Sequence, residues 1–89
     1  MKSRTTKEFW KLHNTLPTSV QVQAKVVYLR WQKDPFHASL DFKRISRKLP
    51  VYSIRIGRSW RALGQRKGDT VTWFWIGSHE AYNTLLNEL

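Results

Sequence analysis

The sequence contains no cysteine, few carboxylates and no long apolar run. Without cysteine, the 89-residue chain has no disulfide framework, no thiolate metal site and no thiol nucleophile. Its three histidines (His13, His37 and His79) lack metal-ligand spacing, so we predict no metal site and no cofactor. The longest strongly apolar run, Val71 to Ile76, is too short to span a membrane, and the basic N-terminus leads into no apolar signal core. We therefore expect a cytoplasmic protein without a membrane partner.

The shortage of carboxylates leaves the chain strongly basic. Only 6 acidic residues oppose 16 lysines and arginines, which gives a formal net charge of +10 at neutral pH. The length predicts a single domain over residues 1–89, and the 40% hydrophobic and 13% aromatic content indicates a folded body rather than a disordered tail. Such a body attracts polyanions such as nucleic acid, although an acidic protein partner would use the same surface.

The N-terminal part predicts two helices. Thr5 and Glu8 form a capping-box pattern at the start of the first helix, and Pro17 ends that helix at about Asn14. The second helix stops at Asp34. Its apolar stripe consists of Val20, Ala24, Val27 and Trp31. Because the connection between the two helices is short, we expect an αα-hairpin.

The C-terminal part has strand patterns. Residues 36–45 indicate a loop or an edge strand, residues 51–56 alternate, and a further strand begins at residues 60–63. Residues 70–76 are β-branched and aromatic, which predicts a central strand covered on both faces. Ser78 can cap a short last helix whose apolar positions are Tyr82, Leu85, Leu86 and Leu89. The predicted fold class is α+β, with the αα-hairpin packed on a three- to four-stranded, mostly antiparallel sheet.

Two strand arginines are the most informative polar residues. Arg55 and Arg61 are flanked by apolar residues, so they point away from the core, where they could clamp a phosphate; two solvated arginines fit the same pattern. His79 follows the central strand and could act as a general acid or base, or be an ordinary surface histidine. Tyr82 could orient a phosphate or simply pack on the sheet. Further RNA- or phosphate-binding candidates are Arg44, Arg47, Lys48 and Arg58.

Three segments carry a family resemblance through their order and spacing. They are Asp34 to Ile45, Tyr52 to Leu63 with its aromatic-arginine pair, and Trp75 to Tyr82 with its Gly-Ser-His step. Together they resemble the RelE/ParE superfamily of toxins from bacterial type II toxin–antitoxin systems, over nearly the whole chain. Members related to RelE cleave messenger RNA on the ribosome by 2′-OH attack on the adjacent phosphate, without a metal.

The resemblance implies roles for individual residues. Arg61 matches the arginine that stabilises charge on the phosphate, His79 matches a family arginine or histidine acid, and Tyr82 matches a late tyrosine. An acidic antitoxin and ribosome-bound messenger RNA are the implied partners. Ser53 stands where RelE has a lysine, no strand glutamate is available as a base, and residues 1–4 are at most a remnant of the family's first strand. A ParE-type non-enzymatic inhibitor of DNA gyrase, and a detoxified relative that only binds an acidic partner or nucleic acid, are the alternatives.

Overall fold

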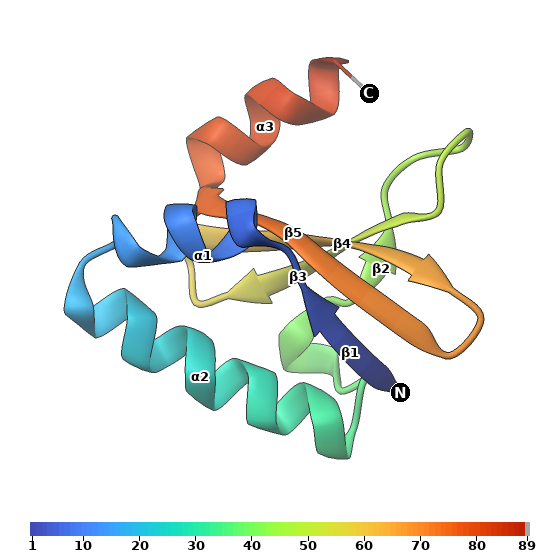
Figure 1. Ribbon diagram of the computed structural model, residues 1–89, viewed down its shortest axis with the longest axis horizontal. Helices are drawn as coiled ribbons and strands as arrows, with labels where there is room; N and C mark the ends of the chain where they lie inside the picture. Colours follow the sequence, from blue (N-terminus) through green and yellow to red (C-terminus); the bar gives the residue numbers. More distant parts are fainter. Residues whose placement is uncertain (89) are drawn as a thin grey trace.

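The protein is described by a computed structural model over residues 1–88, in which helices lie on both faces of a five-stranded sheet (Figure 1). In chain order the elements are β1 (Lys2–Thr5), α1 (Lys7–Asn14), α2 (Thr18–Lys33), a 3-10 turn (Ala38–Leu40), β2 (Lys43–Arg44), β3 (Val51–Ile56), β4 (Trp60–Lys67), β5 (Thr70–Ser78) and α3 (His79–Glu88). The strand order is β1-β5-β4-β3-β2, with β1 parallel to β5 and all other pairs antiparallel. The predicted α+β class is confirmed.

The first two helices lie where the sequence predicts them, but the predicted cap of α1 is wrong. Thr6, not Thr5, is the N-cap, and its hydroxyl accepts a hydrogen bond from the Phe9 N–H at 3.1 Å. Thr5 is the last residue of β1 and pairs with Trp73 of β5, so its backbone stays in the sheet. Its hydroxyl accepts instead from the Trp10 indole nitrogen at 2.8 Å.

The sheet has more strands than the three or four predicted. Residues 2–5 form a complete strand along β5 rather than a remnant, and β2 adds a two-residue strand at the other edge. Most of β1 is exposed, so the segment has no buried face to show in its sequence pattern. Backbone pairing with β5 holds it in place.

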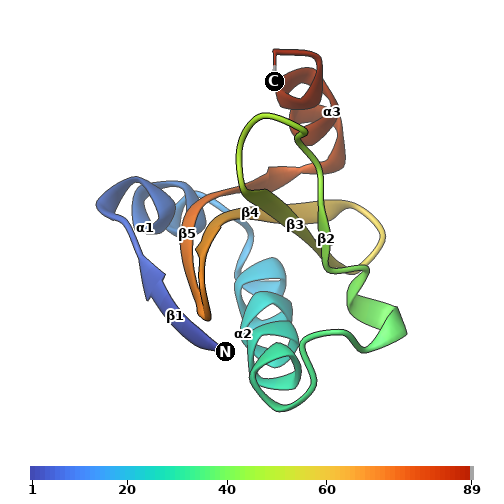
Figure 2. The same cartoon turned by 90° about the vertical axis from the view of Figure 1, so that its right-hand side faces the viewer.

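Figure 2 shows α2 and α3 on opposite sides of the sheet. An apolar cluster lies on each of these two faces. The main cluster joins α1 and α2 to the sheet around Trp31, whose ring is fully buried and meets Phe42 and Trp73 edge-on at centroid distances of 5.8 and 5.3 Å. The smaller cluster forms under α3 from Val51, Leu63 and Tyr82. Trp73 and Ile76 of β5 belong to the main cluster, and Phe74 and Trp75 pack against the smaller one, which confirms the prediction that β5 is covered on both faces. Leu89, the last predicted apolar position of α3, lies outside the described residues.

Gly64 lets β4 and β5 approach each other inside the main cluster. A Cβ at this position would lie 2.4 Å from Val71 Cγ1 and 2.9 Å from the Trp73 ring, so only glycine fits. The register of the two strands shifts between Leu63 and Gly64. None of the helices within residues 1–88 has the length and apolarity needed to cross a bilayer.

Candidate functional site

The two strand arginines face each other across the β3–β4 hairpin. Arg55 pairs directly with Arg61 in the antiparallel register. Residues paired in this way project from the same face with Cβ atoms about 5 Å apart. Leu63, two residues further along β4, belongs to the cluster under α3, so both arginines leave the sheet on the α3 face. The alternation in the sequence indicated this shared face.

One carbonyl oxygen holds both guanidinium groups. Gly57 O accepts a hydrogen bond from Arg55 Nε at 3.2 Å and another from Arg61 Nη1 at 3.2 Å. Arg61 Nη1 also donates to the Trp60 carbonyl at 2.7 Å. Gly57 has a φ of +62°, and the amide of Gln23 in α2 fills the space that a Cβ at residue 57 would occupy. The turn therefore fixes two positive charges side by side.

The arginine pair is not neutralised within the part of the chain that the structure describes. Partial burial lowers the pKa of Arg61, and the nearby charge of Arg55 lowers it further, against smaller opposing effects of Tyr82 and Asp41. Among residues 1–88 the one ion pair joins Lys43 to Asp41 at 3.3 Å. Within residues 1–88 neither Arg55 nor Arg61 is salt-bridged to a carboxylate, so the pair can receive an anion.

His79 lies at the same end of the sheet as the arginine pair. Its backbone N–H donates to the Ser59 carbonyl at 2.7 Å, which ties the end of β5 to the turn between β3 and β4. Arg61 pairs with Gly77, two residues before His79. The imidazole is half-buried, with Nδ1 3.3 Å from the side-chain nitrogen of Asn83. Within residues 1–88 no three histidine, aspartate or glutamate side chains gather closely enough to share a metal ion.

Tyr82 is packed rather than open to solvent. Its side chain is 6% exposed, and its hydroxyl donates to Ser53 Oγ at 3.2 Å. Ser53 is itself buried, which gives a structural role to the position where a lysine was expected. The Tyr82 ring lies beside the His79 ring, with centroids 6.0 Å apart. Tyr82 therefore contributes to the candidate site by packing its ring beside His79, while its hydroxyl is bound to Ser53.

The remaining basic candidates divide into two places. Arg58 is exposed in the turn directly after Gly57, so it adjoins the arginine pair. Arg44 pairs with Tyr52, which packs on the main core cluster, so Arg44 leaves the sheet on the face opposite to Arg55. Its guanidinium donates to the carbonyls of Ser46 and Arg47 at 2.8 and 3.4 Å. Arg44, Arg47 and Lys48 thus form a separate basic segment at the far end of β3.

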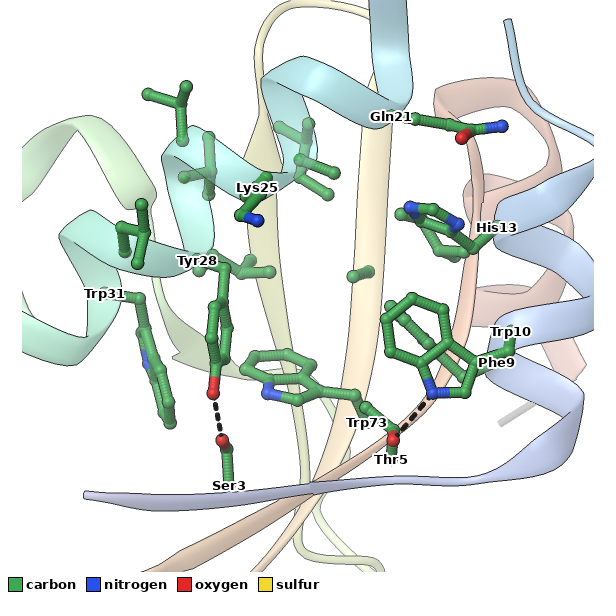
Figure 3. A pocket seen from close by; sticks show the side chains of 18 of the residues that line it. Ser3, Thr5, Phe9, Trp10, His13, Gln21, Lys25, Tyr28, Trp31 and Trp73 are labelled. Carbon is green, nitrogen blue, oxygen red and sulfur yellow. Dashed lines mark hydrogen bonds between the residues drawn. The ribbon is translucent and has the colours of Figure 1, made fainter. Parts of the chain in front are cut away.

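A second feature, on the other face of the sheet, was not anticipated. An apolar groove with a volume of about 820 Å³ lies between β1, α1, α2 and the sheet. Figure 3 shows the side chains that line it. Its wall includes a hydrogen bond of 2.5 Å between Ser3 Oγ and the Tyr28 hydroxyl. Arg4 and Lys25 line it, and none of the acidic residues within positions 1–88 does. Along α2 it exposes Val22, Val26 and Leu29, by 61%, 57% and 49%.

The helical spacing of those three residues was the signal that could have revealed the groove. They recur at intervals of four and three residues, as a second apolar stripe beside the predicted one. A repeated spacing could likewise have indicated that Arg55 donates to the Gly57 carbonyl, because Arg66 donates to the Gly68 carbonyl in the same way, but it gives no sign of Arg61 as the second donor. The sequence has an arginine two residues before a turn glycine twice, at Arg55 and Gly57 and at Arg66 and Gly68.

Comparison with known proteins gives the family. The sequence profile of the ParE-like toxin domain matches residues 18–84. A chain of the RelB–RelE antitoxin–toxin complex from Methanococcus jannaschii is 20% identical, with a TM-score of 0.73 over 92% of this chain and 96% of that chain. YafQ from E. coli is 10% identical, with a TM-score of 0.72 over 91% and 96%. The YoeB/ParE toxin from Agrobacterium tumefaciens is 14% identical, with a TM-score of 0.67 over 89% and 99%.

The TM-scores show that these chains share a fold with this protein, although their sequence identities are low. A search of curated proteins found no match. The profile covers three quarters of the chain, and the similar structures extend the likeness over β1 and α1. The predicted resemblance is thereby confirmed: the fold is that of toxins from toxin–antitoxin systems, and the chain belongs to the ParE-like toxin domain family.

Proposed function

We propose that this protein is the toxin of a type II toxin–antitoxin pair and cleaves messenger RNA on the ribosome without a metal. Family membership supports the toxin role. The observation that carries the ribonuclease role is the pair of Arg55 and Arg61 at the end of the sheet where His79 follows β5. No carboxylate among the described residues 1–88 forms an ion pair with either arginine. Planar guanidinium groups match the oxygens of an RNA phosphate.

The proposed reaction is an internal transfer at one phosphate of the RNA. The 2′-oxygen attacks the adjacent phosphorus, its proton leaves to a base that we do not assign, and the bond from phosphorus to the 5′-oxygen breaks. The products are a 2′,3′-cyclic phosphate and a 5′-hydroxyl. Arg61, with Arg55 beside it, stabilises the negative charge that develops on the phosphate, and His79 supplies the proton to the leaving oxygen.

The other candidate residues have supporting parts in this proposal. Tyr82 packs against the His79 ring and positions it, since its own hydroxyl is engaged by Ser53. Arg58, in the turn beside the arginine pair, contacts the RNA backbone next to the cleaved phosphate. The separate segment of Arg44, Arg47 and Lys48 adds longer-range attraction for nucleic acid.

We further propose an acidic antitoxin as the protein partner. The net charge of +10 favours an acidic chain, and the relative from Methanococcus jannaschii is part of an antitoxin–toxin complex. The apolar groove beside α2 fits an amphipathic helix, and its basic lining by Arg4 and Lys25 fits acidic residues on that helix. The groove and the arginine pair lie on opposite faces of the sheet.

A second function, ParE-type inhibition of DNA gyrase without catalysis, has its own support. The matching profile is that of the ParE-like domain, and Ser53, buried against Tyr82, stands where RelE has a lysine. The two functions differ in the damage they cause. An inhibitor of this type leaves the DNA breaks made by gyrase unsealed, and messenger RNA stays intact.

The experiment induces expression of the wild-type chain and of each variant. It measures growth, the DNA-damage response and the protein level in the same cultures. We expect the wild-type chain to arrest growth without a DNA-damage response, and Arg61→Ala and His79→Ala to relieve the arrest at equal protein level. Arg66→Gln, at the other hairpin turn, is the matched control and should stay toxic. Full toxicity of both site variants would refute the site, and a DNA-damage response would support the gyrase inhibitor. A harmless wild-type chain would indicate the detoxified relative.

A further inference from the structure

Two tryptophans of β5 lie on opposite faces of the sheet, although only one residue separates them. Trp73 is 4% exposed and belongs to the main cluster, whereas Trp75 is half-buried and packs against the smaller cluster under α3. Side chains two residues apart in a regular strand share a face. An irregularity between these two residues therefore turns Trp75 to the other side.

A β-bulge is that irregularity. Trp73 pairs with Gly64 and Trp75 pairs with Leu63, so two consecutive residues of β4 lie opposite three of β5, and Phe74 is left without a partner in β4. Bulges re-aim side chains and are frequent beside active sites. The extra residue brings one large aromatic ring to the face of the sheet that carries the arginine pair.

The Trp75 ring lies next to Arg61 on this face. Arg61 pairs with Gly77, and Trp75 stands two residues before Gly77 on β5, so the two side chains are diagonal neighbours. Such positions are about 7–8 Å apart, within reach of aromatic and long side chains. The indole extends over Gly77, because its Cζ2 and Cη2 lie 2.6 and 2.8 Å from the point that a Cβ at residue 77 would occupy. A glycine opposite Arg61 thus leaves room for the ring beside the arginine.

The other tryptophans do not share this position. Trp31 and Trp73 are enclosed in the main core, at 0% and 4% exposure. Trp60 packs on the main cluster, on the opposite face, and Trp10 lies on α1 at the apolar groove. Of the five tryptophans, all of which are within the described residues, Trp75 alone is half-buried beside the arginine pair.

We propose that Trp75 is a stacking platform for an unpaired RNA base, next to the phosphate that Arg55 and Arg61 hold. The proposal rests on the proposed function for the presence of RNA at this face, and it extends that function from the phosphate to the base. A base and its phosphate are joined through one sugar, so a nucleotide held by the arginines can place its base on a ring beside Arg61. Because the base must leave the stack of a helix, the site takes single-stranded RNA.

The experiment compares two 2′-O-methyl RNA strands of equal length, one of adenosines and one without bases. Both strands carry the same phosphates and neither can be cleaved by attack of the 2′-oxygen, so their affinities differ through the bases. The dissociation constants are measured by fluorescence anisotropy at low ionic strength. We expect the wild-type protein to bind the strand with bases about 5- to 100-fold more tightly. Equal binding of the two strands, or binding of neither, would overturn the proposal.

Variants of the protein locate the platform. Trp75→Leu should bind both strands as weakly as the wild type binds the strand without bases. Trp75→Phe keeps an aromatic ring and should retain a preference of about threefold or more. Trp60→Leu is the matched control, because it removes a half-buried tryptophan from the opposite face, and it should keep the full preference. A preference that survives Trp75→Leu, or that falls equally in Trp60→Leu, would refute the platform.

The same measurements separate the platform from the proposed function. A preference for bases that depends on Trp75, in a protein that leaves messenger RNA intact in cells, counts against the ribonuclease function alone. Cleavage of messenger RNA by a protein with no preference for bases counts against Trp75 alone. The comparison of the two strands on the wild-type protein does not depend on the folding of any variant.

Discussion

Replacing Gly57 by alanine tests whether its backbone conformation holds the arginine pair together. Gly57 and Gly68 have nearly the same positive φ, +62° and +60°. Alanine in this left-handed conformation costs about 1–2 kcal/mol at either position. For a domain of this size, that cost lowers Tm by about 4–16 °C.

The surroundings of the two glycines differ. A Cβ at residue 57 would lie 2.4 Å from Gln23 Nε2, whereas a Cβ at residue 68 would have no neighbour within 4 Å. Gln23 is exposed, so its amide can swing away at small additional cost. We therefore expect the free energies of unfolding of the two alanine variants to agree within about 0.5 kcal/mol. What separates them is the carbonyl of residue 57, because a shifted turn releases both guanidinium groups.

The assay combines urea denaturation with the rise in Tm that we expect inorganic phosphate to cause when it binds to the pair of Arg55 and Arg61. Gly57→Ala should lose the phosphate response, and Gly68→Ala, at matched stability, should keep it. The double variant with Gln23→Ala should not restore the response, because the strain in the backbone remains. Retention of the full response in Gly57→Ala, or equal loss in both alanine variants, would refute the role of the turn.

Three further predictions test the packing and the partner surface. Tyr82→Phe and Ser53→Ala should each lower the free energy of unfolding by about 1 kcal/mol. The double variant should lose less than the sum of the two, because both changes remove the same hydrogen bond; additive losses in urea denaturation would contradict that bond. Gly64→Ala should destabilise the protein by about 1–3 kcal/mol because its Cβ would meet Trp73, and an unchanged melting curve would show that the core has room. Val26→Asp, on the exposed stripe of α2, should leave folding and toxicity intact but reduce co-purification of the antitoxin at least tenfold; undiminished capture would exclude the groove.

Elements with a buried face could be predicted from the sequence. The apolar spacing of α2 and the β-branched, aromatic run of β5 indicated both elements because their side chains form the main core. By contrast, β1 is mostly exposed and is held by backbone pairing to β5, which leaves no periodic pattern. The same strand explains the misplaced cap, because Thr5 stays paired with Trp73 and the helix begins one residue later.

The candidate site could be predicted only as far as local patterns reach. Strand alternation indicated that Arg55 and Arg61 share a face, and the register places them opposite each other. The approach of Gln23 to Gly57 joins residues more than thirty positions apart, and no local pattern encodes such a contact. The burial of the Tyr82 hydroxyl on Ser53 depends in the same way on how α3 packs over the sheet.

Primer extension on a translated message tests the central claim most directly. After induction of the wild-type chain, the account predicts new 5′ ends in phase with the codons. These ends should disappear when the start codon of the message is removed, and they should be absent when Arg61→Ala is expressed at the same level. Growth arrest with an intact message, or cleavage that does not require translation, would contradict it.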